Sequence, residues 1–180
     1  MSSRILEALK ATNVKHNVGS LNNWGKEVLN QGAKVVLTGA ETYLDNYILG
    51  ELGFDATTGE RTVKSLSDAT KKGVLIASVE DYLQEYETIS DFFNGADELA
   101  RIVYQESGKR FDASNFTLDD PTKVVKNGQV AHYDITTKKF IISNGAGNNA
   151  GYATAGNKYV VVNNDLYTFD GQAIIRFEIA

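Results

Sequence analysis

The chain has 180 residues, of which 42% are hydrophobic and 23% charged, and its formal net charge is −5. This length predicts a single domain that can bury about 70% of the surface exposed by the unfolded chain. An acidic chain lacks the basic face that nucleic acids and anionic membranes require, so neither partner is expected. The absence of cysteine excludes disulfides, thiolate metal sites and cysteine nucleophiles.

Residues 1–27 predict an N-terminal arm that precedes a single β-rich domain over residues 28–180. A short apolar helix would begin the arm, and an Asn-rich, extended stretch with the lone Trp24 would follow it. His16 lies in this extended stretch and is expected to be exposed. No apolar run is long enough for a signal peptide or a bilayer span, so we expect a protein that folds in a cytoplasm.

The first part of the β-rich domain mixes strand and helix signals. Residues 33–39 form an apolar run that predicts a strand ending in glycine. Thr38 and Glu41 have the spacing of a capping box, which favours the start of a helix over residues 40–52. One face of this helix would carry three apolar residues, namely Leu44, Ile48 and Leu52. We therefore expect a helical and loop insertion at about residues 40–70.

The middle of the chain alternates between short apolar runs and acidic segments. Residues 73–78 predict a buried strand. The acidic stretch that follows favours one or two short helices, whose inward side would carry Leu83, Tyr86, Ile89 and Phe93. Two further strands are expected on either side of Gly108.

The C-terminal half is almost entirely β in character. Asn127-Gly128 and Asp170-Gly171 are strong signals for two-residue hairpin turns, and residues 133–143 read as another hairpin. In the last strand, Ile175, Phe177 and Ile179 alternate with charged residues, which indicates a half-buried strand. We expect a mainly β fold, an antiparallel barrel or sandwich with short helices and the N-terminal arm, with an α+β fold as the alternative.

A glycine-rich stretch after one predicted strand resembles a phosphate-binding loop. Gly145, Gly147 and Gly151 follow the run KKFIIS, but the next segment, KYVVV, is itself a strand signal. A dinucleotide loop needs a helix at this point, because the helix N-terminus holds the pyrophosphate. The stretch therefore predicts a connection between two strands at a hairpin tip, and we expect no nucleotide cofactor.

The remaining polar residues give no catalytic signature. His132 shares a strand face with Asp134, but no nucleophile motif accompanies them, so a histidine packed on the sheet is expected. Three carboxylate pairs are present in the sequence: Glu41/Asp45, Glu80/Asp81 and Asp119/Asp120. A solvated acidic face explains these pairs, and we expect no metal site and no enzyme activity.

Residues 73–114 carry a series of features in a distinctive order. A strand that ends in Ala77-Ser78 is followed by an acidic segment rich in Tyr and Phe, then Gly95, then a strand after Ala100-Arg101, and then a glycine turn before Phe111. In this order of elements the chain resembles small tailed-bacteriophage head proteins of the capsid decoration or cement type. Two longer segments, residues 40–69 and 144–157, would add contact surface.

The resemblance implies a non-enzymatic structural role in the virion. The protein would bind the capsid surface to decorate or stabilise it, with the major capsid protein or other virion proteins as partners, and it would act as a homo-oligomer if it follows capsid symmetry. The partner contacts would come from six arm residues, namely the apolar anchors Ile5, Leu6, Leu9 and Trp24 and the edge-strand residues Val14 and Val18.

Two other functions remain open at this point. A head-fibre, tail or host-surface adhesion module would bind glycan or protein through loop tips such as Gly145–Asn157. A hydrolase would need one of the carboxylate pairs to converge in a cleft, and at least one of its carboxyl pKa values would be strongly shifted.

Overall fold

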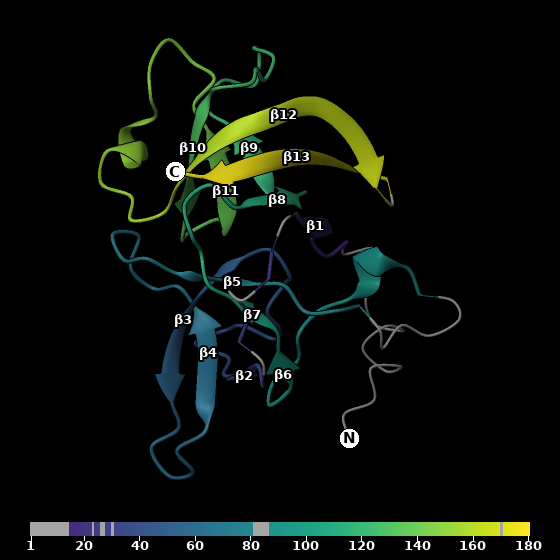
Figure 1. The fold of residues 1–180 in the computed structure, drawn as a ribbon, viewed down its shortest axis with the longest axis vertical. Coiled ribbons are helices and arrows are strands. Elements are labelled where there is room, and N and C mark those ends of the chain that lie inside the picture. Colours follow the sequence, from purple (N-terminus) through teal and green to yellow (C-terminus); the bar gives the residue numbers. More distant parts are fainter. Residues whose placement is uncertain (1–14, 23, 26–27, 30, 81–86, 170) are drawn as a thin grey trace.

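The computed structural model describes residues 15–22, 24–25, 28–29, 31–80, 87–169 and 171–180, with the backbone alone described at 163–169. These residues form thirteen strands and two 3-10 helices. The mainly β class expected from the sequence is therefore confirmed. The strands make two mixed sheets in a sandwich-like arrangement (Figure 1). No helix in the described ranges is long and apolar enough to cross a membrane.

The larger sheet has seven strands in the order β1-β8-β13-β12-β10-β11-β9. Its strands are β1 Gly19–Asn22, β8 Arg110–Ala113, β9 Phe116–Leu118, β10 Val130–Asp134, β11 Lys139–Ile142, β12 Lys158–Phe169 and β13 Gln172–Ile179. All neighbours are antiparallel except β9 and β11. The strand β1 forms one edge, so the end of the predicted arm belongs to this sheet.

The smaller sheet has six strands in the order β6-β2-β4-β3-β5-β7. Its strands are β2 Ala33–Val35, β3 Leu49–Phe54, β4 Arg61–Ser65, β5 Val74–Ile76, β6 Leu99–Ala100 and β7 Ile102–Val103. Only β2 and β4 are parallel. The two edge strands, β6 and β7, are separated by Arg101 alone. One short stretch of chain therefore supplies both edges of this sheet.

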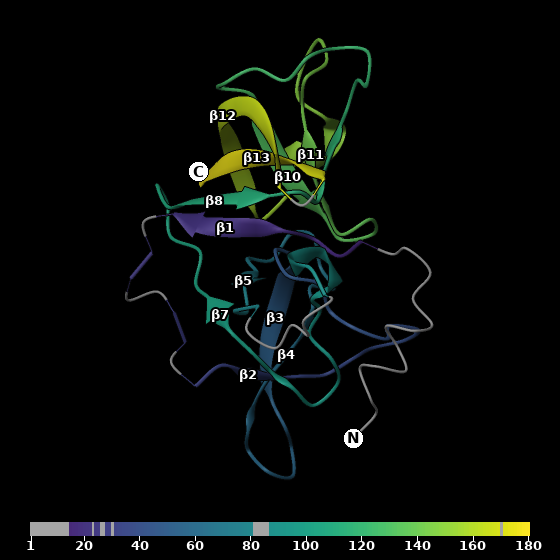
Figure 2. The ribbon, with the colours of Figure 1, turned by 90° about the vertical axis from the view of Figure 1, so that its right-hand side faces the viewer.

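The two sheets pack around a common hydrophobic core. Figure 1 shows the larger sheet above the smaller one, and Figure 2 shows β1 and β8 on the side nearest to β5 and β7. Four side chains of the larger sheet stack with ring centroids 5.0 to 6.2 Å apart, namely Phe111, Phe140, Tyr159 and Phe177. They belong to the same buried cluster as Leu49, Leu75 and Ile102 of the smaller sheet.

Several strands lie where the sequence predicted them. The runs at 33–39 and 73–78 contain β2 and β5. The hairpin predicted at 133–143 is the antiparallel pair of β10 and β11. The strands β12 and β13 also pair antiparallel, with Phe169 opposite Gln172, and Asp170 of the predicted turn lies outside the described residues. The side chains of Ile175, Phe177 and Ile179 are buried as the alternation indicated. The two strands beside Gly108 are β7 and β8, which belong to different sheets.

The helix predicted over residues 40–52 is wrong. Leu44 forms an isolated bridge with Asn94, Tyr47 has a left-handed φ of 58°, and β3 begins at Leu49. The four-residue spacing of the apolar residues is an even number, so it also places them on one face of an extended chain. The capping-box contact does form, because the Thr38 N–H donates to the Glu41 carboxylate at 2.9 Å. It closes a local turn and no helix follows.

Two turn predictions need correction. Residues 144–157 are not a hairpin tip, because β11 and β12 pair with opposite sides of β10 and the stretch crosses from one to the other. It contains the 3-10 helix η2 (Ala150–Tyr152), and the strand β12 follows it as expected. Asn127-Gly128 forms a turn, but no strand precedes it in residues 119–126. Of the helices expected after residue 78, the described part is η1 (Ile89–Asp91).

Candidate functional site

The described residues of the predicted arm are packed against the larger sheet. Val18 has no exposed surface, its N–H donates to Ser114 Oγ at 3.0 Å, and its carbonyl accepts from the Ser114 N–H at 2.9 Å. Trp24 is half-buried and its indole N–H donates to the Arg110 carbonyl at 2.6 Å. Val18 is thus engaged within its own chain, and Trp24 keeps part of its surface for a partner. The other four predicted contacts, Ile5, Leu6, Leu9 and Val14, lie outside the described residues.

His16 is buried, with 5% of its surface exposed, which corrects the expectation that it is exposed. Its Nδ1 lies 2.6 Å from Asp45 Oδ1, and its ring packs edge-on against Tyr43 at 4.6 Å. Its backbone N–H donates to the Ser90 carbonyl at 2.7 Å, and its carbonyl accepts from Gln172 Nε2 at 2.7 Å. These partners come from the segment before β3, from η1 and from β13, so His16 fixes the point where the arm joins the domain.

Glu41 forms an ion pair that joins the two sheets. Its carboxylate accepts from Lys138 Nζ at 2.6 Å, in the turn between β10 and β11, and also from the hydroxyl of Ser65, the last residue of β4. Burial raises the pKa of Glu41, but the hydrogen bonds from Lys138, Ser65 and Thr38 outweigh it and lower the pKa to about 2. A carboxyl group with so low a pKa stays ionised and cannot donate a proton near neutral pH.

The other carboxylates of the sequence pairs also have separate structural partners. Asp45 contacts His16, and Glu80 Oε1 accepts from Asn46 Nδ2 at 3.0 Å. Asp119 Oδ1 accepts from the Asn149 side chain, whereas Asp120 Oδ1 accepts from the Thr122 hydroxyl and N–H. The remaining member, Asp81, lies outside the described residues. The structure therefore brings none of the described pairs together around a shared reaction centre.

His132 is packed on the outer face of the larger sheet, as expected, and is covered by η2. Only 4% of its surface is exposed, and the Tyr152 ring lies edge-on to it at 6.5 Å. Its Nδ1 is buried and has no hydrogen-bond partner. Asp134 lies on the same face, but its carboxylate accepts from the N–H groups of Thr136 and Thr137. Burial lowers the pKa of His132, against the opposing effect of Asp134 and Asp119.

The stretch 144–157 is attached to the smaller sheet at its far end. Asn157 Oδ1 accepts from the Gly73 N–H at 2.9 Å, and Asn157 Nδ2 donates to the Lys71 carbonyl at 2.7 Å. The Gly156 N–H donates to the Ala69 carbonyl at 2.8 Å. These bonds occupy the side-chain amide of Asn157 and the N–H of Gly156. The stretch thus links the two sheets of the domain.

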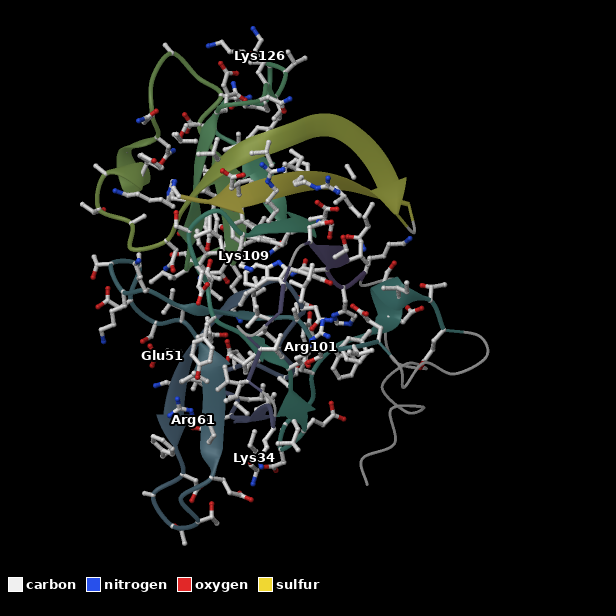
Figure 3. The ribbon with its side chains drawn as sticks, viewed as in Figure 1. Lys34, Glu51, Arg61, Arg101, Lys109 and Lys126 are labelled. Carbon is white, nitrogen blue, oxygen red and sulfur yellow. The ribbon has the colours of Figure 1, made fainter. Side chains whose placement is uncertain are left out.

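The hairpin of β3 and β4 extends away from the larger sheet (Figure 1) and carries Arg61 (Figure 3). Phe54 is 67% exposed, and the Arg61 guanidinium lies 4.6 Å from its ring centroid. The turn is closed locally, because Asp55 Oδ1 accepts from the N–H groups of Thr57 and Thr58, both at 2.8 Å. Phe54 and Arg61 are therefore held on a well-ordered support.

Two further residues extend this exposed end across β2 and β6. Lys34 lies opposite Thr62 in β4 and opposite Leu99 in β6. Leu99 is 71% exposed, and Lys34 Nζ lies 3.1 Å from Asp97 Oδ1. Because Lys34 pairs with Thr62, the neighbour of Arg61, Lys34 and Leu99 lie on the face of the sheet opposite to Phe54 and Arg61. We call these four residues at the end of the sheet the tip surface. It includes an exposed aromatic ring and an arginine, and both residue types are enriched in protein interfaces.

The sequence analysis missed the tip surface because it assigned residues 40–70 to a helical and loop insertion. Asp55 and Gly59 bracket a short turn, but in Arg61–Ser65 Val63 alone is buried, so no alternation of apolar and polar residues marks this strand. Among the residues that the structure describes, no group of three or more His, Asp or Glu side chains is placed to hold a metal ion.

Comparison with known proteins gives one close relationship. A family described as "YonC prophage protein" matches residues 12–180. The "SPbeta prophage-derived uncharacterized protein YonC" of Bacillus subtilis (strain 168) is 44% identical over 184 residues, which cover 99% of this chain and 98% of the relative. No solved structure shows significant similarity to the chain.

Proposed function

Because the chain belongs to the YonC prophage protein family, and is thus a phage protein, we propose that it is a non-enzymatic structural protein of the virion. In this proposal it binds the outer surface of the capsid and decorates or stabilises it. The partner is the major capsid protein or a neighbouring virion protein, and copies of the chain follow the symmetry of the capsid sites.

The tip surface is the observation that supports this proposal. Phe54 is 67% and Leu99 is 71% exposed, although large apolar side chains stabilise a protein when they are removed from water. The hairpin is closed by its own hydrogen bonds, so docking it orders few additional groups and costs little conformational entropy. Aromatic residues and arginine are both enriched in protein interfaces, and the net charge of −5 disfavours a nucleic acid or an anionic membrane as the partner.

The arm remains part of the proposal in a shorter form. The described residues from His16 to Asn22 complete the larger sheet, so a truncation that tests the arm should end at residue 14. Ile5, Leu6, Leu9 and Val14 are all removed by that truncation, whereas Val18 and Trp24 stay in place. Loss of capsid binding on truncation would assign part of the contact to the arm.

The experiment is co-sedimentation of the purified protein with capsids of the parent phage. We expect saturable binding at a fixed ratio to capsid subunits, and the double variant Phe54→Ser/Leu99→Ser should bind at least about tenfold more weakly. The matched control is Val124→Ser, since Val124 is 72% exposed on the loop that carries Lys126 at the opposite end of the molecule (Figure 3). Absence of binding by the wild-type protein would contradict the capsid proposal.

Binding measurements with the double variant and with a glycan array also separate capsid decoration from the adhesion alternative. If the double variant binds capsids as well as wild type, the tip surface is not the contact and the arm becomes the first alternative. An adhesion module would bind neither capsid nor capsid protein but would retain a glycan on an array. The hydrolase alternative predicts turnover of a chromogenic ester or glycoside that Glu41→Gln abolishes, and the low pKa of Glu41 argues against it.

A further inference from the structure

Residues 149–153, which contain η2, lie against β10 on the outer face of the larger sheet. His132 is the residue beneath this cover, and 96% of its surface is removed from solvent, since only 4% is exposed. Its cross-strand neighbours on the same face are Ile141 of β11 and Lys158 of β12. Val130 and Val160, half-buried on the same face, pair with each other one step further along the sheet.

The contact between His132 and the cover is very close. A Cβ atom at Gly151 would lie only 2.5 Å from His132 Nε2, so glycine is the residue that lets the backbone pass over the ring. Asn149 holds the cover in place, because its side chain accepts from the Gly151 N–H at 2.9 Å and its own N–H donates to Ser143 Oγ at 2.9 Å. The Tyr152 ring closes the other side of the imidazole at 6.5 Å.

A charged imidazole does not fit this position. Protonation makes both ring nitrogens hydrogen-bond donors, but Nδ1 is buried and has no partner. A buried donor without an acceptor costs free energy, and a buried charge without a counter-ion costs more. The neutral ring tolerates the site because one of its nitrogens carries no proton.

The charged groups around the ring do not supply that counter-ion. Asp134 on β10 already accepts from the Thr137 hydroxyl, and Asp119, which precedes β10 in the chain, accepts from Asn149. On β12, Lys158 Nζ lies 5.0 Å from the Tyr152 ring and adds a positive charge on this face. Among the described residues neither carboxylate forms an ion pair with His132. If Asp119 turned toward a charged ring, Asn149 would lose one of its anchors.

We propose that His132 and Gly151 form an acid-sensitive latch: protonation of His132 releases residues 149–153 from the outer face of the larger sheet. The bonds of Gly156 and Asn157 to residues 69–73 are unaffected, so the released segment stays attached at its C-terminal side. Release exposes a small apolar area formed by Val130, Ile141 and Val160. The latch is independent of capsid binding at the tip surface.

The sign of the effect follows from the protonation states. Burial lowers the pKa of His132 below that of an exposed histidine. The closed cover is therefore fully stable above about pH 6.5, the usual pKa of histidine, and loses stability as the pH falls toward the lowered value.

The test is hydrogen exchange of the full-length protein at pH 7 and pH 5, analysed by mass spectrometry and corrected for the intrinsic pH dependence of exchange. We expect exchange at residues 149–155 to become about tenfold faster at pH 5, since one pH unit within the titration window changes the opening equilibrium tenfold. His132→Gln has no titrating ring and should lose this response. His16→Gln, the matched variant at the other buried histidine, should keep it.

Two results would overturn the latch. One is equal corrected exchange of residues 149–155 at both pH values in the wild-type protein. The other is a response that persists in His132→Gln. If His132→Gln does not fold, Gly151→Ala provides the second route, because its methyl group displaces the cover from the ring. In Gly151→Ala, fast exchange of residues 149–155 already at pH 7, with no further increase at pH 5, supports the latch. Slow exchange of these residues in Gly151→Ala at pH 7 contradicts it.

Discussion

Two connections of this molecule have similar compositions and opposite roles. The stretch 144–157 and the β3–β4 turn at residues 55–60 are both polar and contain glycine. In the longer stretch the anchoring bonds reach distant residues, such as the bond from Asn157 to Lys71, 86 positions away. In the shorter turn the bonds are local, such as those from Thr57 and Thr58 to Asp55.

The difference identifies which segment belongs to the fold and which is available to a partner. The end of the longer stretch, Gly156 and Asn157, separates from residues 69–73 only when the contact between the sheets is lost, so this end is linked to global stability. A hairpin closed by its own turn keeps its shape without those contacts and can project side chains such as Phe54 into solvent. Substitutions in the first should therefore change stability, and substitutions in the second should change binding.

The largest expected effect is that of Gly156→Ala. A Cβ atom at Gly156 would lie 2.3 Å from the Thr70 carbonyl oxygen and 2.7 Å from the Lys71 carbonyl carbon. Both neighbours are backbone atoms, so the clash is relieved only by moving the loop or the strand end. We expect the free energy of unfolding to fall by about 3 kcal/mol, measured by urea denaturation.

Gly147→Ala is the control within the same stretch, because no atom lies within 4 Å of the position of its Cβ. Its free energy of unfolding should stay within about 0.5 kcal/mol of wild type. If the two variants were equally stable, the stretch would not be attached to residues 69–73 in solution, and the contrast with the β3–β4 turn would disappear.

The ion pair of Glu41 and Lys138 gives the next largest effect. The pKa of Glu41 is lowered to about 2, so the carboxylate contributes to stability above its unfolded pKa of about 4.5 and loses that contribution as the pH falls toward 2. Lys138 is partly exposed, which weakens the attraction through solvent screening. We expect Glu41→Gln to lower the free energy of unfolding by about 2 kcal/mol at pH 7.

The pH dependence distinguishes the ion pair from simple loss of packing. The stability difference between wild type and Glu41→Gln should shrink between pH 4.5 and pH 2, measured by denaturation at each pH. Glu60→Gln is the control, because the Glu60 side chain is 58% exposed and lies 3.9 Å from Lys34. A difference that stays constant down to pH 2 would mean that Glu41 acts through its shape and not through its charge.

The β half of the fold could be predicted because its signals are local. The alternation at Ile175, Phe177 and Ile179 and the turn signal of Asp170-Gly171 depend on neighbouring residues only. The three apolar side chains are buried, and β12 and β13 form the expected antiparallel pair. Which strands pair with one another could not be predicted from such local signals. Gly108 lies between two strands of different sheets, and nothing in its neighbourhood indicates that the chain changes sheets there.

The segment 38–52 shows why a local signal can mislead. Thr38 and Glu41 make the contact of a capping box, but the other oxygen of Glu41 is used by Lys138, 97 positions away. Leu44 and Asn94 exchange backbone hydrogen bonds, at 2.9 and 2.8 Å, which an α-helix would have to break. The distant partners therefore determine the conformation, and they outweigh the helical spacing of Leu44, Ile48 and Leu52.

The candidate site was only partly predictable for the same reason. The buried state of His16 depends on Asp45 and Gln172, and neither is near it in sequence. The exposure of Phe54 depends on β3 and β4 extending beyond the core, which is a property of the sheet and not of the residue. The arm prediction was made from residues 1–24, and the contact role of its residues 1–14 remains to be tested by truncation.

The smallest expected effect on stability is that of Asp55→Ala. This variant tests directly whether the β3–β4 turn, unlike residues 144–157, is independent of the rest of the fold. Asp55 is half-buried, and its carboxylate accepts from the N–H groups of Thr57 and Thr58 and orders the turn. Its removal should speed amide exchange at residues 55–60 without a measurable change in Tm, because no distant bond is lost. It should also weaken capsid binding modestly, since Phe54 and Arg61 would have to be ordered on docking. A fall in Tm would show that the turn, like residues 144–157, supports the whole domain, and the tip surface could then no longer be treated as independent of the fold.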